Sequence, residues 1–105
     1  MPYLSIRDLH SGIVREFETD EVSVGRDPRC TLIVSGEGAD VVSGFHARFV
    51  SRDGKWWVED SGSRNGTTLN DHPVSRNHPQ PATQGSVVGL GDRGPRFQVE
   101  AIDRR

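Results

Sequence analysis

Apolar and polar residues alternate along most of this chain, in short runs separated by glycine, proline and other turn-forming residues. Clear examples are Tyr3–Ile6, Glu21–Gly25 and Arg96–Ala101. This period of two is typical of β-strands that bury one face. No stretch carries the apolar stripe of an amphipathic helix. Many short strands at even spacing predict an all-β fold, a sandwich or a barrel.

Further extended runs are expected at residues 13–17, 31–34, 46–50, 55–59, 68–69 and 86–90. Asp53-Gly54 stands between two of these runs and predicts a hairpin, since both residues tolerate a positive φ. Trp56 and Trp57 point to opposite sides of one strand, so we expect one in the core and the other partly exposed. The polar stretch Asn70–Gly85 is expected to be a surface excursion.

The chain has 105 residues, the size of one domain. We expect a single domain over residues 1–105 with a core of about residues 3–101, either a small protein or a module of a longer one. No apolar run approaches the roughly 20 residues of a membrane helix, and the first residues do not form a signal peptide. We therefore expect no membrane insertion and a cytoplasmic location.

Charge and cysteine content narrow the possible functions. A net charge of −2 and a pI near 6.0 argue against a nucleic-acid binder. Cys30 is the only cysteine, which rules out an internal disulfide and a cysteine-rich zinc site; we expect no metal and no cofactor. Of the 13 basic residues, all but Lys55 are arginines. Arginine suits phosphate recognition, although a codon bias toward arginine would explain the same skew.

Three polar loops interrupt the predicted strands. Arg26 follows directly after a strand that ends at Gly25, Ser43 lies in a second loop, and Asn65-Gly66 lies in a third. A guanidinium makes charge-assisted hydrogen bonds to phosphate oxygens. A hydroxyl and backbone N–H groups can add donors, and a carboxamide offers a donor and an acceptor to a ligand backbone. This combination suits recognition of a phosphorylated peptide.

The order of these residues resembles a known family, the forkhead-associated (FHA) domain, from about Tyr3 to Ala101. The matching pieces are Gly25-Arg26, Ser43 with His46-Ala47, Trp57, Asp60-x-Gly62-Ser63-x-Asn65-Gly66-Thr67, Asn70 and Gly91-Asp92. The resemblance implies a β-sandwich of two mixed or antiparallel sheets with about eleven strands. It also implies that loops at one end bind phosphothreonine peptides without catalysis.

The resemblance also implies roles for individual residues. Arg26 and Ser43 would bind the phosphate, Asn65 would hold the peptide main chain, and His46 would brace the serine loop. The residues implied to keep the loops in shape are Gly25, Gly66, Thr67 and Asn70.

This chain departs from the family pattern at two expected ligand contacts. Gly44 stands where the family usually has arginine, and Arg64 where it often has threonine or serine. One lost charge-assisted hydrogen bond costs about 1.5–3 kcal/mol, and Arg64 turned inward would restore part of this. Glu37 and Asp40 lie in an insertion before the serine loop; facing the ligand, they would weaken phosphate binding or select a basic peptide residue.

Three hypotheses follow from these residues. The first is a non-enzymatic module that binds a partner protein containing phosphothreonine, which an upstream Ser/Thr kinase has phosphorylated. The second keeps the fold but binds a partner, or a second copy of itself, without phosphate. The third is a hydrolase that uses Ser43, His46 and Asp60, which is disfavoured because no Gly-x-Ser-x-Gly elbow surrounds the serine.

Overall fold

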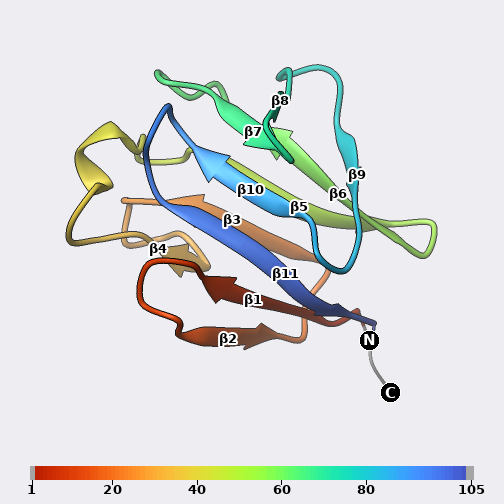
Figure 1. Cartoon of the computed structure of the whole chain (residues 1–105). Helices are drawn as coiled ribbons and strands as arrows, with labels where there is room; N and C mark the ends of the chain where they lie inside the picture. Colours follow the sequence, from red (N-terminus) through yellow and green to blue (C-terminus); the bar gives the residue numbers. More distant parts are fainter. Residues whose placement is uncertain (1, 104–105) are drawn as a thin grey trace.

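The computed structural model describes residues 2–103 and is built almost entirely of β-strands (Figure 1). One short 3₁₀ helix, η1 (Ala39–Val41), lies among them. The strands are β1 (Leu4–Asp8), β2 (Val14–Phe17), β3 (Glu21–Gly25), β4 (Leu32–Ile33), β5 (Ala47–Arg52), β6 (Lys55–Asp60), β7 (Thr67–Leu69), β8 (His72–Pro73), β9 (Gln80–Ala82), β10 (Val87–Leu90) and β11 (Arg96–Ile102). The predicted all-β class with about eleven strands is confirmed.

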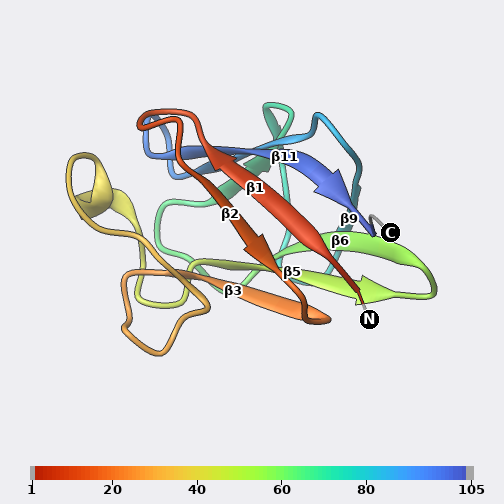
Figure 2. The same ribbon diagram turned by 90° about the horizontal axis from the view of Figure 1, so that it is seen from below.

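The strands form two sheets that pack face to face, as Figure 2 shows for β1, β2 and β11 above β3, β5 and β6. One sheet has the order β2-β1-β11-β10-β7-β8 and the other β4-β3-β5-β6-β9. Only the pairing of β3 with β4 is parallel; the other pairings among residues 2–103 are antiparallel. The fold is thus a sandwich of two mixed or antiparallel sheets.

The β5–β6 hairpin shows how local sequence sets the register. Asp53 and Gly54 both have positive φ, 53° and 77°, as a two-residue hairpin turn requires. Arg52 faces Lys55 across the turn, and the pairing continues to Ala47 opposite Asp60. The predicted hairpin is therefore confirmed. It places the loop before β5, which carries Ser43 (the serine loop), beside the loop after β6, which carries Asn65 (the asparagine loop), at the far end of the sheet.

Alternate side chains of both sheets meet in a closed apolar core. The largest fully buried side chains are Trp56, Phe49, Leu4, Ile6 and Leu90. Trp57, on the other side of β6, is only partly buried, so the expected division between the two tryptophans is confirmed. No buried side-chain nitrogen or oxygen among residues 2–103 lacks a hydrogen-bond partner.

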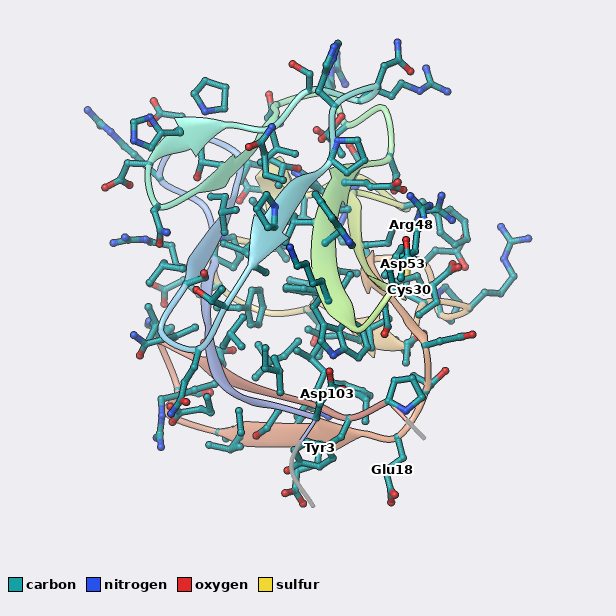
Figure 3. The ribbon with its side chains drawn as sticks, turned by 90° about the vertical axis from the view of Figure 1, so that its right-hand side faces the viewer. Tyr3, Glu18, Cys30, Arg48, Asp53 and Asp103 are labelled. Atoms are coloured by element: carbon teal, nitrogen blue, oxygen red, sulfur yellow. The ribbon has the colours of Figure 1, made fainter. Side chains whose placement is uncertain are left out.

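One of these interior polar groups ties the chain ends to the core. The Trp56 indole N–H donates to Asp103 Oδ1 at 3.1 Å, and the backbone N–H of Tyr3 donates to the same oxygen at 3.2 Å. Figure 3 shows Tyr3 and Asp103 side by side at this end of the sandwich. Because the indole reaches its partner from the core, β6 is anchored to the beginning of β1 and the end of β11.

The polar stretch Asn70–Gly85 is not only a surface excursion, so that expectation is wrong in part. It contains β8 and β9, and β9 pairs with β6, placing Ala82 opposite Trp56. Val74 and Ala82 are both buried. Pairing supplies hydrogen bonds to an edge of β6 that would otherwise be unpaired, which explains why a polar segment with proline joins the sheet.

The loops between the strands gather at two ends of the sandwich. Figures 1 and 2 place the β3–β4, β4–β5 and β10–β11 loops at one end, opposite the start of β1 and the end of β11. Strand order alone thus brings loops that are far apart in sequence to one rim. Within residues 2–103, no helix is long and apolar enough to cross a membrane.

We predict that Trp56→Phe destabilises the domain by about 2–4 kcal/mol, since it removes buried volume and the donor to Asp103. Urea unfolding followed by circular dichroism measures the change. Trp57→Phe is the matched control, expected to cost less than about 1 kcal/mol because this side chain is only partly buried. Equal losses for both variants would contradict the inward orientation of Trp56.

Candidate functional site

Backbone hydrogen bonds join the loop between β3 and β4, which carries Arg26 (the arginine loop), to the serine loop. The N–H of Arg26 donates to the carbonyl of Ser43 at 3.1 Å, and the N–H of Asp27 donates to the carbonyl of Gly44 at 3.0 Å. A Cβ at Gly25 would lie 2.1 Å from the Gly44 carbonyl oxygen. Only glycine permits this approach, so Gly25 is what sets the base of the Arg26 side chain beside Ser43.

His46 joins the serine loop to the asparagine loop. It is fully buried. Its Nδ1 accepts the backbone N–H of Ser43 at 3.0 Å, and its Nε2 lies 2.7 Å from the carbonyl oxygen of Gly66. Because Nδ1 accepts, the ring proton is on Nε2, which donates to Gly66. One imidazole therefore fixes the separation of the two loops.

Asp60, the last residue of β6, organises the asparagine loop. Its Oδ2 accepts the N–H groups of Gly62 and Ser63, both at 3.0 Å. Its Oδ1 accepts the hydroxyls of Ser63 and Thr67, the latter at 2.7 Å. Burial alone would raise the pKa of Asp60, but hydrogen bonds from Ser63, Thr67 and Gly62 outweigh it, so this pKa lies below its ordinary value.

The rest of the asparagine loop is tied to the serine loop and to η1. Gly66 has φ 86° and its N–H donates to the Ser63 hydroxyl at 3.0 Å. The backbone N–H of Arg64 donates to Ser43 Oγ at 3.0 Å, and Asn65 Nδ2 donates to the carbonyl of Val41 at 2.8 Å. Ser43 and Asn65 are therefore held from both sides before any ligand binds.

Several polar groups on this rim have no partner among residues 2–103. Ser43 Oγ accepts from Arg64, but no acceptor for its own proton is present. Asn65 has a free Oδ1 and a second free N–H. The exposed side chains of Arg26 and Arg64 make no hydrogen bond or ion pair. The free donors, the Asn65 Oδ1 acceptor and the two guanidinium groups thus face solvent, whereas every buried side-chain nitrogen and oxygen among residues 2–103 has a hydrogen-bond partner.

The acidic neighbour of Arg26 does not offset its charge. Asp27 pairs with Arg29 through two hydrogen bonds of 3.0 Å. Together with the backbone N–H of Arg29, they lower the pKa of Asp27 to about 2. Arg29 also lies over Phe45 of the serine loop, with Cζ 5.0 Å from the ring centroid. The carboxylate is committed to Arg29, which leaves the Arg26 guanidinium unpaired.

The structure brings most of the residues predicted for the site together. Backbone or side-chain hydrogen bonds link the loops that carry Arg26, Ser43, Gly44, Arg64 and Asn65. Asn70 is different: it forms the β7–β8 turn with φ 50° and bonds Val87 through its N–H and its Oδ1. It holds β7 against β10 at the end of β7 away from Thr67.

The positions of two other residues could not be predicted from the sequence. Glu37 of the acidic insertion borders a groove with Leu9 and Ile13, away from the serine loop. Arg76, which no sequence pattern singled out, lies over Gly62: its Cζ and Nη1 are each 3.4 Å from where a Cβ of Gly62 would be. The only available signal was that Arg76 is the sole basic residue in the stretch 70–85 other than histidine.

The geometry gives no support to the hydrolase hypothesis. Both ring nitrogens of His46 are engaged, with the Ser43 backbone and with Gly66, and neither is bonded to Ser43 Oγ. Asp60 bonds the residues of its own loop, not the imidazole. A serine hydrolase needs a base on the nucleophile and an acid on the base, and neither contact is present.

Comparison with known proteins identifies the family. The model of the FHA domain matches residues 22–91, so the chain belongs to the FHA domain family. This fold is a binding module. No curated protein sequence matches the chain.

Three solved structures illustrate the similarity. The FHA domain of an Arabidopsis thaliana hypothetical protein is 24% identical with TM-score 0.86, over 100% of this chain and 90% of its own. The FHA-1 domain of Mycobacterium tuberculosis Rv1747 is 30% identical with TM-score 0.73, over 95% and 98%. A domain described for phosphothreonine-dependent FHA interactions is 22% identical with TM-score 0.77, over 94% and 96%.

We predict that Asp60→Asn destabilises the domain by about 2–3 kcal/mol at neutral pH, because an amide NH₂ must replace one of two carboxylate oxygens that each accept two hydrogen bonds. The lowered pKa of Asp60 means that its contribution is present above the unfolded pKa and is lost as pH falls through the folded one. The difference between the proteins should therefore shrink below about pH 4.

Urea unfolding at a series of pH values measures this effect. The control is Asp53→Asn, which makes the same charge change at an exposed turn residue whose side chain forms no hydrogen bond within residues 2–103. A difference between wild type and Asp60→Asn that stays constant from neutral to acid pH would show that the carboxylate is not the hub of the loop.

Proposed function

We propose that this chain is a phosphothreonine-peptide binding module that recognises a partner protein after a Ser/Thr kinase has modified it. The observation that carries the proposal is the set of unpartnered polar groups on Arg26, Ser43 and Asn65, held on three loops by backbone hydrogen bonds. A preorganised set of donors binds without a large ordering cost. The related domain with phosphothreonine-dependent interactions supports the same ligand class.

The phosphate is assigned to Arg26 and Ser43. The Arg26 guanidinium offers N–H donors in a planar fork that matches two phosphate oxygens. The Ser43 hydroxyl already accepts from the backbone of Arg64, so its proton is directed outward as a donor. A phosphate carries about −1.5 to −2 charges at neutral pH and three acceptor oxygens, which favours it over an unmodified hydroxyl.

The peptide main chain is assigned to Asn65. One N–H of its carboxamide is used on Val41, which fixes the plane of the amide. The remaining N–H and Oδ1 then form a donor and acceptor pair that matches a backbone C=O and N–H of an extended ligand. Gly66 and Thr67 hold this amide in place through the Asp60 network.

A phosphate-independent interaction is the second candidate, because a groove with three exposed apolar side chains lies elsewhere on the same end of the domain. Leu9, Ile13 and Ile33 are exposed to 42%, 55% and 48%, and all three line it. A groove of exposed apolar side chains is a common feature of protein-binding surfaces. Dependence on Arg26 separates the two candidates, since this residue does not line the groove.

We predict that a phosphothreonine peptide selected from a library binds the wild-type domain and that Arg26→Ala weakens binding by at least about 100-fold, through loss of a charge-assisted contact. Isothermal calorimetry measures both affinities, with Lys55→Ala, an exposed cation at the β5–β6 turn, as the control. Equal binding of the dephosphorylated peptide, or full affinity in Arg26→Ala, would refute the phosphate-binding role.

We predict that Gly44→Arg raises the affinity for the same peptide about five- to tenfold, by adding a second cation beside Ser43. The position accepts a side chain, since the nearest atom to a Cβ there is Asp27 Cβ at 3.9 Å. Gly44→Gln, of similar length without charge, should leave the affinity close to wild type. A gain in both variants would show that added contact area, not charge, is responsible.

A further inference from the structure

A cleft on the outer side of β6 borders the proposed phosphate site. Phe45, Ser61, Arg76 and Asn77 line it, and Arg48 and Glu59 lie on its floor. Phe45 comes two residues after Ser43 in the serine loop, and Ser61 follows Asp60. The cleft therefore lies next to the loops that carry Ser43 and Asn65.

The guanidinium of Arg76 lies over Gly62 in the asparagine loop. Its Cζ, Nη1 and Nε lie 3.4, 3.4 and 3.6 Å from the position that a Cβ of Gly62 would occupy. Three guanidinium atoms at nearly equal distance mean that the flat face of the group lies on Gly62. The N–H bonds lie in the plane of the guanidinium, so they point sideways, along the surface of the loop.

Arg76 is the unpaired charge of this cleft. Glu59 pairs with Arg48 and Arg52 at 2.6 and 3.2 Å, and Glu21 with Arg48 at 3.4 Å. Asp60 accepts its hydrogen bonds from the asparagine loop. Among residues 2–103, Arg76 has neither an ion pair nor a hydrogen bond. Glu21 and Glu59 are thus paired with arginines, and the charged carboxylate of Asp60 is engaged by hydrogen bonds within its own loop, so Arg76 remains at the edge as a cation without a partner among residues 2–103.

We propose that this cleft binds a second anionic group of the ligand, a carboxylate or a second phosphate on a residue flanking the phosphothreonine, and that Arg76 contacts it. This inference rests on the proposed function. The domain then selects peptides by two separated anions, one at Arg26 and Ser43 and one at Arg76. The second cation compensates in part for the missing arginine at position 44.

The test compares phosphothreonine peptides in which glutamate, or phosphoserine, is placed in turn at each flanking position of a neutral parent peptide. Fluorescence anisotropy gives the affinity of each relative to the parent. We expect one flank position where glutamate strengthens binding about two- to fivefold, as exposed ion pairs do. Phosphoserine there should give about tenfold, because its charge is larger.

The deciding measurement is the same ratio in Arg76→Gln. There the gain from either anion should disappear, whereas it should persist in Arg15→Gln, an exposed arginine on β2 that has no hydrogen bond or ion pair among residues 2–103. A gain that survives Arg76→Gln, or no gain at any position while the parent phosphopeptide still binds, would overturn this inference alone. Failure of the wild type to bind any phosphothreonine peptide would overturn the proposed function and this inference together.

Discussion

The whole site depends on one steric constraint, the contact of Gly25 with the backbone of residues 43 and 44. Gly25 is the last residue of β3, so its position is fixed by pairing with β4 and by the hydrogen bond from Val34 to its carbonyl. Without a Cβ, the chain can place its backbone against the Gly44 carbonyl. The sheet thereby determines the position of the serine loop, and the loop determines where Arg26 and Ser43 meet.

The other loops are positioned by buried or half-buried groups that are not available to a ligand. His46 is hydrogen-bonded to both the serine loop and Gly66, and Asp60 accepts hydrogen bonds from the turn that contains Asn65. Both are largely satisfied by internal partners, so replacing them should alter loop shape and not ligand chemistry. Ser43 and Asn65 differ from them, because each uses part of its side chain to hold the loops together and leaves the rest facing solvent.

Much of this arrangement could be predicted from the sequence, because its causes are local. The alternation of apolar and polar residues predicted β1, β3 and β11, and Asp53-Gly54 predicted the hairpin. The order of the loop residues indicated that they share one rim. β9 could not be predicted, since Gln80-Pro81-Ala82 has little strand character and pairs only because β6 offers an edge beside Trp56. The place of Arg76 over Gly62 could not be predicted either: the Val74 N–H bonds the Thr67 carbonyl and brings the chain beside the asparagine loop, a contact that has no signal in the sequence around Arg76.

The proposed binding of an anion by a chain of net charge −2 is consistent with the way its arginines are paired. Arg48 and Arg52 on the sheet face are matched by Glu59, and Arg29 is matched by Asp27. Arg26, Arg64 and Arg76 belong to the three loops or border them, and they have no such partners among residues 2–103. Exposed charges farther apart than the Debye length, about 8 Å at physiological ionic strength, are largely screened from one another. An anion at the rim would therefore respond mainly to these neighbouring cations, so the proposed phosphate binding depends on local pairing and not on total charge.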